Sequence, residues 1–548
     1  MCPWRVHHGS SRDGFSTTHP VELGPNECII SGAAAPSLTF PTMHSHRLTI
    51  VLFAFATAGL LVALRLDAQS QPALRPHTTW VGAGSGETLP REMVFENTLG
   101  RLGVLNVSGP IDTVNHPFFT AIGSNARACV TCHQPANAMS VSVESIRERW
   151  RATGGRDPIF AAIDGSNNPS LAQNEASSHS LLLNRGLFRV GMPWPPPGVT
   201  PEFTIEVVRD PTGVNRDPVY GFASANPTVS VFRRPRIAAN LKYVTSPDGL
   251  FNVKLGVLMD KDPDTGLPSS MNIMADARVP SLSVQAQSAY RDHQGGQGPL
   301  TRAQLERILA FENQIYVAQV WDARGGSLIE PGGPEALGPA NVARHSVHVL
   351  NGPKTPAFHF FDMWLTRSAA PDPQAGFRES VARGDDIFLN RRFWVKDVAH
   401  INSIGLANPA KRTCAVCHNA QTSGMDLAPG WVDLGTTNFP TWTESPVWSE
   451  SPELPVFKLT CRRDTPPHPF LGREIYTSDP GRALVTGHCA DIGAITMGQF
   501  RGLAARAPYF SNGSAKDLRE LVDYYDRRFD MRLSGQEKQD LINFLGVL

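Results

Sequence analysis

The sequence has no surplus of charge of either sign, because its 548 residues include 50 Lys or Arg and 50 Asp or Glu side chains. A chain without a basic surplus lacks the electrostatic footprint of a nucleic-acid-binding protein, and we expect no nucleic-acid partner. Cysteine is also scarce, since 8 residues are too few for a scaffold held together by disulfides. The 47 glycines and 45 prolines follow no fixed period, which excludes a collagen-like repeat. These absences leave a loop-rich globular protein of more than one domain.

Only one long apolar run occurs, over residues 49–64; it follows Met43 and a basic stretch and precedes the small residue Ala68. A basic flank, a short apolar core and a small residue after it are typical of a secretory signal peptide, here over 43–68. The core has 16 residues, fewer than the ~20 that a membrane-spanning helix needs, so an uncleaved anchor is the weaker alternative. We therefore expect a non-native extension over 1–42, translation from Met43 and export to the periplasm.

Two pentapeptides share the pattern C-x-x-C-H, namely Cys129-Val-Thr-Cys132-His133 and Cys414-Ala-Val-Cys417-His418. Two thiols one helical turn apart can add to the two vinyl groups of one haem, and the adjacent histidine then lies under the iron as its proximal ligand. A zinc site would need four ligands close together, whereas these pairs are far apart and each has its own histidine. The motifs therefore predict two covalently bound haem c groups, the first on Cys129, Cys132 and His133 and the second on Cys414, Cys417 and His418.

Two further cysteines of the exported part, Cys461 and Cys489, belong to neither motif. In an oxidising compartment two such thiols most often form a disulfide, and we expect that pairing here. Two buried thiols are the alternative. The last two cysteines, Cys2 and Cys28, lie in the expected N-terminal extension.

The ligand opposite His418 is expected to be Met497, which lies in a glycine-flanked loop ahead of the last helices. A thioether in that position raises the reduction potential of a haem iron and suits electron transfer. Met425 is too close to His418 in the sequence to reach round the macrocycle. The alternative role for Met497 is core packing, which is common for methionine.

The ligand opposite His133 is less well defined by the sequence. His293 and His116 are the leading candidates, and a sixth position left open for substrate is a further alternative. Other histidines that could serve are His179, His345 and His348.

Apolar residues at helical spacing predict helices near the C-terminus of each half of the chain. One helix is expected from Thr301, with apolar residues up to Tyr316 on one face. Two more are expected after capping-box-like starts at Ser514 and Ser534. Strand-like alternation is rare, so the predicted fold is mainly α. It consists of two cytochrome c-like haem domains with long loops and few short strands, over 69–365 and 377–548, joined by a linker over 366–376.

These features resemble the bacterial di-haem cytochrome c peroxidase (MauG-like) superfamily. The resemblance covers most of residues 95–548 and is strongest in the segments 476–484, 491–493 and 501–514, which look like the part of the family that wraps the second haem. In the first half, Met274-Ala-Asp-Ala-Arg278 and Ser281-Leu-Ser-Val-Gln285 are similar to the family's W-D-G-R and L-x-x-Q stretch. Alanines stand in place of that tryptophan and glycine, and a large insertion over 251–270 has no counterpart in the short peroxidases.

The resemblance implies that the C-terminal haem accepts electrons from a small redox protein and that the N-terminal haem is the reactive or low-potential centre. Gln285 and His293 are then the candidate catalytic residues, because His293 lies nearest to the position of the family's glutamate. A calcium ion between the domains is also implied, although the sequence does not place its ligands. A homodimer is left open.

Two functions from different classes follow from these expectations. The first is an oxidoreductase of the cytochrome c peroxidase type that reduces hydrogen peroxide or another small substrate. The second is a non-catalytic electron-transfer protein in which both irons are six-coordinate. Both retain the two haems and differ at the N-terminal one.

Overall fold

The computed structural model describes seven stretches of the chain: 80–245, 272–345, 360–365, 372–400, 409–418, 431–438 and 451–548. All of these stretches belong to one compact unit. Several expectations lie outside the described residues, namely the extension and signal peptide over 1–68, the insertion over 251–270, Met425, His348, and most of the linker over 366–376. Within the described residues, no helix is both long and apolar enough to cross a membrane.

The expectation of a mainly α fold is wrong. Helices make up 33% of the structure and strands 19%, and the strands form six small sheets among the described residues. Most strands are only two to seven residues long, and several are buried on both faces, as in β7 (Thr228–Arg233). A short run that is buried on both faces shows no alternation of apolar and polar residues, so its period cannot reveal it in the sequence.

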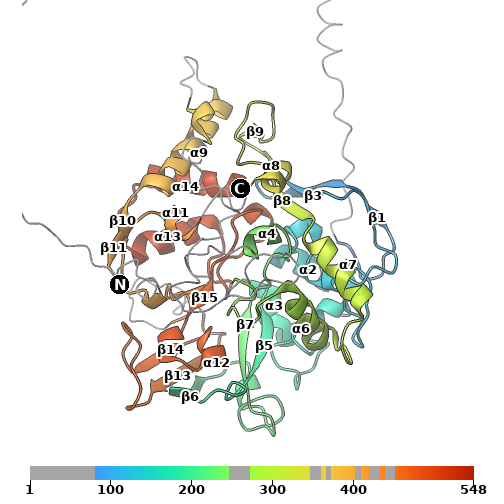
Figure 1. Cartoon of the computed structure of the whole chain (residues 1–548), viewed down its shortest axis with the longest axis vertical. Coiled ribbons are helices and arrows are strands. Elements are labelled where there is room, and N and C mark those ends of the chain that lie inside the picture. Colours follow the sequence, from blue (N-terminus) through green and yellow to red (C-terminus); the bar gives the residue numbers. More distant parts are fainter. Residues whose placement is uncertain are drawn as a thin grey trace, which may run out of the picture. The chain divides into compact units, whose positions relative to one another are not determined.

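The two larger sheets are antiparallel (Figure 1). The four-stranded sheet has the order β2 (Glu92–Asn97), β3 (Gly100–Asn106), β8 (Ile315–Asp322) and β9 (Gly326–Ser327). The three-stranded sheet has the order β14 (Glu474–Thr477), β13 (Val456–Cys461) and β6 (Phe203–Arg209). Four two-stranded ladders complete the set: β1 (Thr88–Leu89) with β4 (Ile111–Asp112), β5 (Phe188–Pro193) with β7, β10 (Phe393–Val395) with β11 (Ala410–Arg412), and β12 (Trp431–Val432) with β15 (Ile495–Thr496).

The described α-helices are mostly short. Those before residue 350 are α2 (Val143–Thr153), α3 (Ser180–Arg185), α4 (Leu241–Val244), α6 (Leu282–Gln294), α7 (Arg302–Glu312) and α8 (Pro339–Arg344). Those after it are α9 (Pro373–Asn390), α11 (Cys414–Cys417), α12 (Ala483–Thr486), α13 (Leu518–Arg528) and α14 (Gly535–Val547).

Capping decides where the sequence-based helix predictions succeed. The side chains of Thr301 and Ser534 form capping boxes at the starts of α7 and α14, as expected. Helix α13 begins later than expected, because Asp517 rather than Ser514 accepts the hydrogen bond from the Glu520 amide. Helix α7 also ends at Glu312, and the apolar residues that follow it begin strand β8.

Strands and ion pairs join segments that are far apart in the sequence. Strand β6 pairs with β13 along its whole length. The buried Arg233 guanidinium binds the carboxylates of Asp276 and Asp479, with each closest N–O distance at 2.6 Å. Contacts therefore connect residues of the two expected domains, and the domain boundaries stay a prediction.

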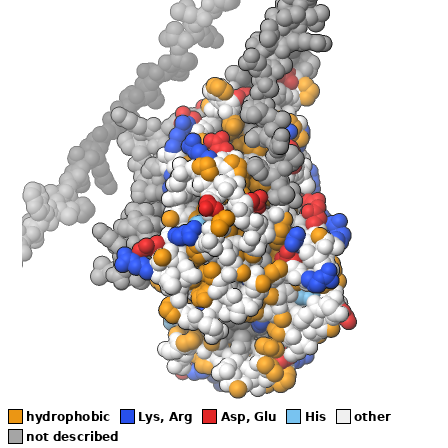
Figure 2. All heavy atoms as spheres, turned by 90° about the vertical axis from the view of Figure 1, so that its right-hand side faces the viewer, with side chains coloured by type: hydrophobic (Ala, Val, Ile, Leu, Met, Phe, Trp, Pro, Cys, Tyr) orange, Lys and Arg blue, Asp and Glu red, His pale blue; other side chains and the backbone are white. Residues whose placement is uncertain are grey.

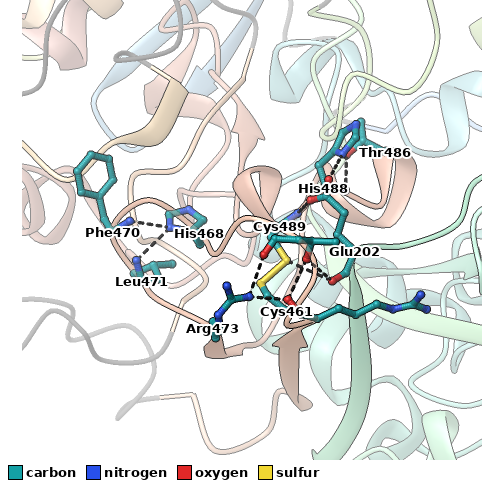
Figure 3. Close-up of a disulfide and its surroundings, with 11 residues drawn as sticks. Glu202, Cys461, His468, Phe470, Leu471, Arg473, Thr486, His488 and Cys489 are labelled. Carbon is teal, nitrogen blue, oxygen red and sulfur yellow. Dashed lines mark hydrogen bonds and ion pairs between the residues drawn. A yellow bond between two sulfur atoms is a disulfide. The ribbon is translucent and has the colours of Figure 1, made fainter.

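The expected disulfide between Cys461 and Cys489 is confirmed. It ties the end of β13 to the turn before β15, and Glu202 supports it from the neighbouring strand segment (Figure 3). The Glu202 carboxylate accepts hydrogen bonds from the Cys489 amide at 2.8 Å and from the His488 ring at 3.0 Å. On the face shown in Figure 2, basic and acidic side chains are interspersed, in keeping with the absence of net charge.

Candidate functional site

A cavity brings residues of the two C-x-x-C-H motifs together. Its volume is about 290 Å³, close to the lower end of the ~300–1,000 Å³ usual for small-molecule sites. Its walls are mostly apolar, and they include His133 from the first motif and Cys414, Cys417 and His418 from the second. Two motifs that are far apart in the sequence therefore contribute to one site.

Backbone contacts fix the first motif and the ring of His133. A single 3-10 turn, Cys129–Thr131, carries the cysteines, and the amides of Cys132 and His133 both donate to the Cys129 carbonyl at 3.1 Å. The His133 Nδ1 atom lies 2.9 Å from the Met139 carbonyl oxygen. Histidines that bind metals usually donate one ring N–H to such an acceptor and use the other nitrogen as ligand. Burial lowers the pKa of His133, which favours the neutral imidazole that binds iron.

Three of the four motif thiols are kept neutral by their surroundings. Burial raises the pKa of Cys129, Cys132 and Cys414 to about 12 in each case. The Gln294 side-chain amide donates to the Cys129 sulfur at 3.5 Å. None of the four motif cysteines forms a disulfide, whereas Cys461 and Cys489 do. The donor set therefore fits covalent attachment of haem through two thioether pairs.

The second motif lies in more apolar surroundings. Helix α11 is one turn, and the His418 amide donates to the Cys414 carbonyl at 2.9 Å. The His418 ring stacks on Phe500 with 4.5 Å between centroids, and the Tyr525 ring lies perpendicular to it with 6.5 Å between centroids. These side chains belong to the apolar cluster around α9, α13 and α14. Helices α9 and α14 approach closely at Gly384, where a Cβ atom would lie 2.1 Å from the Asp540 carbonyl.

Met497 lines the same cavity, directly after strand β15, and is 6% exposed. Its carbonyl accepts a hydrogen bond from the Arg236 guanidinium at 3.1 Å, which fixes the loop. Met274 and Met531 also line the cavity, and neither was expected from the sequence to be a haem ligand. The assignment of Met497 as the ligand opposite His418 therefore stays a prediction.

His116 and His293 are not among the residues that line this cavity. The His116 Nδ1 atom accepts a hydrogen bond from the Phe118 amide at 3.2 Å, and its ring packs against Phe119 and Phe311. Burial and the nearby Arg307 charge lower the pKa of His116 to about 4. Neither observation tests its predicted role as a ligand.

His293 lies near the end of α6, beside the first motif. Its Nδ1 atom is 2.6 Å from the Asp164 carboxylate, which also forms a buried ion pair with Arg127. Burial favours the neutral carboxyl, but Arg127 and His293 overcome it and hold the pKa of Asp164 below its ordinary value. The carboxylate fixes the ring of His293, and its role as a ligand or catalytic residue stays a prediction. Both ring nitrogens of His179, by contrast, lie within 2.9 Å of backbone carbonyls.

Gln285 and Glu312 line the cavity together with His133. Gln285 lies in the first half of α6, and its catalytic role stays a prediction, whereas Glu312 was not identified from the sequence. Glu312 is 6% exposed and is the one carboxylate among the described residues that line the cavity. Glu312 lies on the same face of α7 as the apolar residues Leu305, Ile308 and Leu309. An acidic residue on an apolar helix face is the sequence feature that could have identified Glu312 as a candidate functional residue.

Three arginines, Arg234, Arg236 and Arg506, also line the cavity and were not identified from the sequence. Within the described ranges, no group of three or more His, Cys, Asp or Glu side chains is arranged to hold a metal ion. The calcium ion that the family resemblance implies therefore stays a prediction.

Comparisons with known proteins give a weak and partial similarity. No family model matches the chain. The chain is 27% identical over 168 residues to the cytochrome-c peroxidase IdrP1 of Pseudomonas sp. (strain SCT), and the match covers 28% of this chain and 40% of that protein. The chain thus matches less than half the length of this curated relative.

Among solved structures, the chain is similar to hydrazine synthase of Kuenenia stuttgartiensis pressurized with 20 bar xenon. The two share 12% sequence identity and superpose with a TM-score of 0.28, over 58% of this chain and 73% of that one. A TM-score this low does not establish a shared fold.

Proposed function

We propose that this protein is a periplasmic oxidoreductase that carries two covalently bound haem c groups and reduces hydrogen peroxide with electrons from a small redox protein. The observation that carries the proposal is the single cavity lined by residues of both C-x-x-C-H motifs. The partial similarity to a cytochrome-c peroxidase supports haem-based redox chemistry.

In this proposal Cys129 and Cys132 attach the first haem and His133 is its proximal ligand. Cys414 and Cys417 attach the second, with His418 and Met497 as its axial ligands. The bound irons supply single-electron steps and a coordination position for a small substrate. The hydrogen bond of His133 to the Met139 carbonyl supports this assignment, because it fixes the ring and leaves Nε2 for the metal.

Reduction of peroxide to water also requires proton transfer between the two oxygens. Glu312 is suited to take a proton from one oxygen and return it to the other, since its carboxylate faces the cavity in mostly apolar surroundings. The Gln285 amide N–H is suited to donate a hydrogen bond to the departing oxygen. His293, held by Asp164, stays a second candidate for the proton transfer.

Export and the electron donor rest on the sequence. Haem c is attached outside the cytoplasm, which agrees with the signal peptide expected over 43–68. The second motif is the proposed entry point for electrons because its surroundings are apolar and because Met497 lies near it in the cavity. A nucleic-acid partner is not proposed.

The test is to produce the chain in a bacterial host that attaches haem c and to measure haem content and peroxide consumption. We expect two haems per chain that survive denaturation, and turnover of hydrogen peroxide when a reduced small cytochrome is supplied. Haem that is lost on denaturation would overturn the covalent assignment. Two haems with permanently low-spin irons and no peroxide consumption after reduction would overturn the peroxidase and favour the electron-transfer protein.

A further inference from the structure

Three cavity-lining arginines lie where the surroundings of the two motifs meet. Arg234 and Arg236 follow strand β7, and Arg506 comes from the loop after residues 503–505. The Arg234 guanidinium donates to the Arg506 carbonyl at 3.0 Å, which joins the two segments. We call Arg234, Arg236 and Arg506 the arginine cluster.

Backbone contacts connect this cluster to both motifs. The Arg236 side chain donates to the carbonyl of Met497, on the side of the second motif. Two residues further on, the Ala238 amide donates at 3.0 Å to the Met139 carbonyl, the same oxygen that holds the His133 ring. The cluster therefore lies between the proximal histidine of the first motif and the candidate ligand of the second.

The cluster has no carboxylate partner among the described residues. The hydrogen bonds of its side chains within the described part of the chain all go to neutral oxygens, including the carbonyls of Val141, Thr496 and Gln499. The Arg506 Nε atom is buried and has no hydrogen-bond partner in the described part of the chain. The adjacent Arg233 shows the opposite arrangement, because it forms ion pairs with Asp276 and Asp479.

The electrostatics of these neighbouring arginines differ accordingly. Burial and the charge of Arg506 lower the pKa of Arg234 to about 9. Burial lowers the pKa of Arg236 to about 10. Repulsion from Arg233 and Arg506 adds to this fall, and the Asp276 charge opposes it. Burial also lowers the pKa of Arg506 to about 10. Buried cations without anions are destabilising, whereas a carboxylate forms paired, charge-assisted hydrogen bonds with a guanidinium group.

We propose that the arginine cluster would bind the propionate carboxylates of the haems attached at the two motifs. This inference rests on the proposed function. Each haem brings two carboxylates into a cavity whose walls are otherwise mostly apolar, and Glu312 is the one opposing charge among its described lining residues. Guanidinium groups are well suited to carboxylates because of their planar, forked geometry.

The test is the reduction potential of each haem in Arg236→Gln and Arg506→Gln, measured by optical redox titration. Removing a positive charge beside the propionates favours the oxidised iron. We expect a change of about tenfold in the one-electron equilibrium, which corresponds to a fall of about 59 mV. In the charge-retaining variants Arg236→Lys and Arg506→Lys, the reduction potential should fall by less than half of that amount. Arg302→Gln, which removes a fully exposed arginine of α7, is the matched control and should leave both potentials unchanged.

A soluble anion is the other possible occupant of the cluster, and the same titration distinguishes it. If propionates fill the cluster, the wild-type potentials do not depend on added acetate or phosphate. A dependence on these anions that disappears in Arg506→Gln would overturn the proposal in favour of a soluble anion site.

The remaining outcomes are also decisive. Unchanged potentials in both glutamine variants, with both haems retained, would overturn the propionate assignment and leave the proposed function intact. A wild-type protein without covalent haem would instead overturn the proposed function. If a glutamine variant does not fold, resonance Raman spectra of the wild type and the lysine variants report the hydrogen bonding of the propionates. Identical propionate bands in wild type and both lysine variants would then reject the contact.

Discussion

The two C-x-x-C-H motifs have the same residue pattern but different surroundings. Around the first, a backbone carbonyl fixes His133, and a glutamate and a glutamine line the adjoining cavity wall. Around the second, His418 stacks on Phe500 within an apolar cluster of α9, α13 and α14. Polar groups can exchange protons with a substrate, whereas an apolar shell suits electron transfer. Under the proposed function, the difference teaches that the motif determines where a haem would be attached, and that the surroundings of the motif determine whether the site suits proton transfer or electron transfer.

The largest expected effect is the loss of either haem. Cys129→Ala/Cys132→Ala and Cys414→Ala/Cys417→Ala should each remove one of two covalent haems, because each pair of thiols attaches its own group. Haem staining after denaturation and the haem content per chain measure this loss. We expect both double variants to lose peroxide turnover, for different reasons: the first lacks the reactive site and the second lacks the electron entry. A double variant that keeps both covalent haems would contradict the assignment of that motif.

The next effect concerns proton transfer at the first site. Glu312→Gln should lower the rate of peroxide turnover by about 10²-fold or more, since acid–base catalysis by one group contributes about that much. Both covalent haems and reduction of the second haem by the donor should be unaffected, and Glu312→Asp should recover part of the rate. The control is Glu306→Gln, which changes an exposed glutamate of the same helix. A normal rate in Glu312→Gln would show that His293 or another group carries out the proton transfer.

A smaller effect is expected at the second site. Met497→Ala should abolish the near-infrared band of a sulfur-to-iron bond and lower the reduction potential of one haem, because a thioether ligand raises that potential. Met531→Ala is the control, since Met531 also lines the cavity and is similarly buried. An intact band in Met497→Ala that disappears in Met531→Ala would assign the ligand to Met531 instead.

The sequence was most informative where the signal is local. The capping boxes at Thr301 and Ser534 and the disulfide between Cys461 and Cys489 could be predicted because they depend on few residues. The start of α13 was misplaced because Ser514 and Asp517 are both good capping residues, and only the backbone decides between them.

Pairings between distant segments could not be predicted. Strand β6 finds its partner β13 about 250 residues later in the chain, and no local pattern encodes that register. The cavity has the same origin, because Glu312, Arg236 and Arg506 meet only after the chain has folded. The prediction of a mainly α fold was therefore wrong because the sheets depend on pairing between distant segments. The C-x-x-C-H motifs, by contrast, are short enough to be recognised from a few neighbouring residues.

The smallest expected effect is a difference in how the two motifs respond to acid. Burial holds the pKa of His116 at about 4, below its ordinary value of 6.5, so the unfolded chain binds more protons as the pH falls. The stability that neutral His116 contributes is present above pH 6.5 and is lost between pH 6.5 and about 4. Its ring packs on Phe119 and Phe311, and Phe311 in turn contacts Phe118 beside His133. We therefore expect the first motif to loosen in acid before the second.

Hydrogen exchange of the haem-loaded protein between pH 6.5 and 4 measures this difference, with the amides of residues 414–418 as the internal reference. In His116→Asn, which keeps an acceptor for the Phe118 amide, the slope of unfolding free energy against pH should fall by at most ~1.4 kcal/mol per pH unit, the value for one proton. The amides of the first motif should then keep their protection to lower pH. Equal loss of protection at both motifs in the wild type would show that acid does not distinguish them, and that His116 does not couple protonation to the first site.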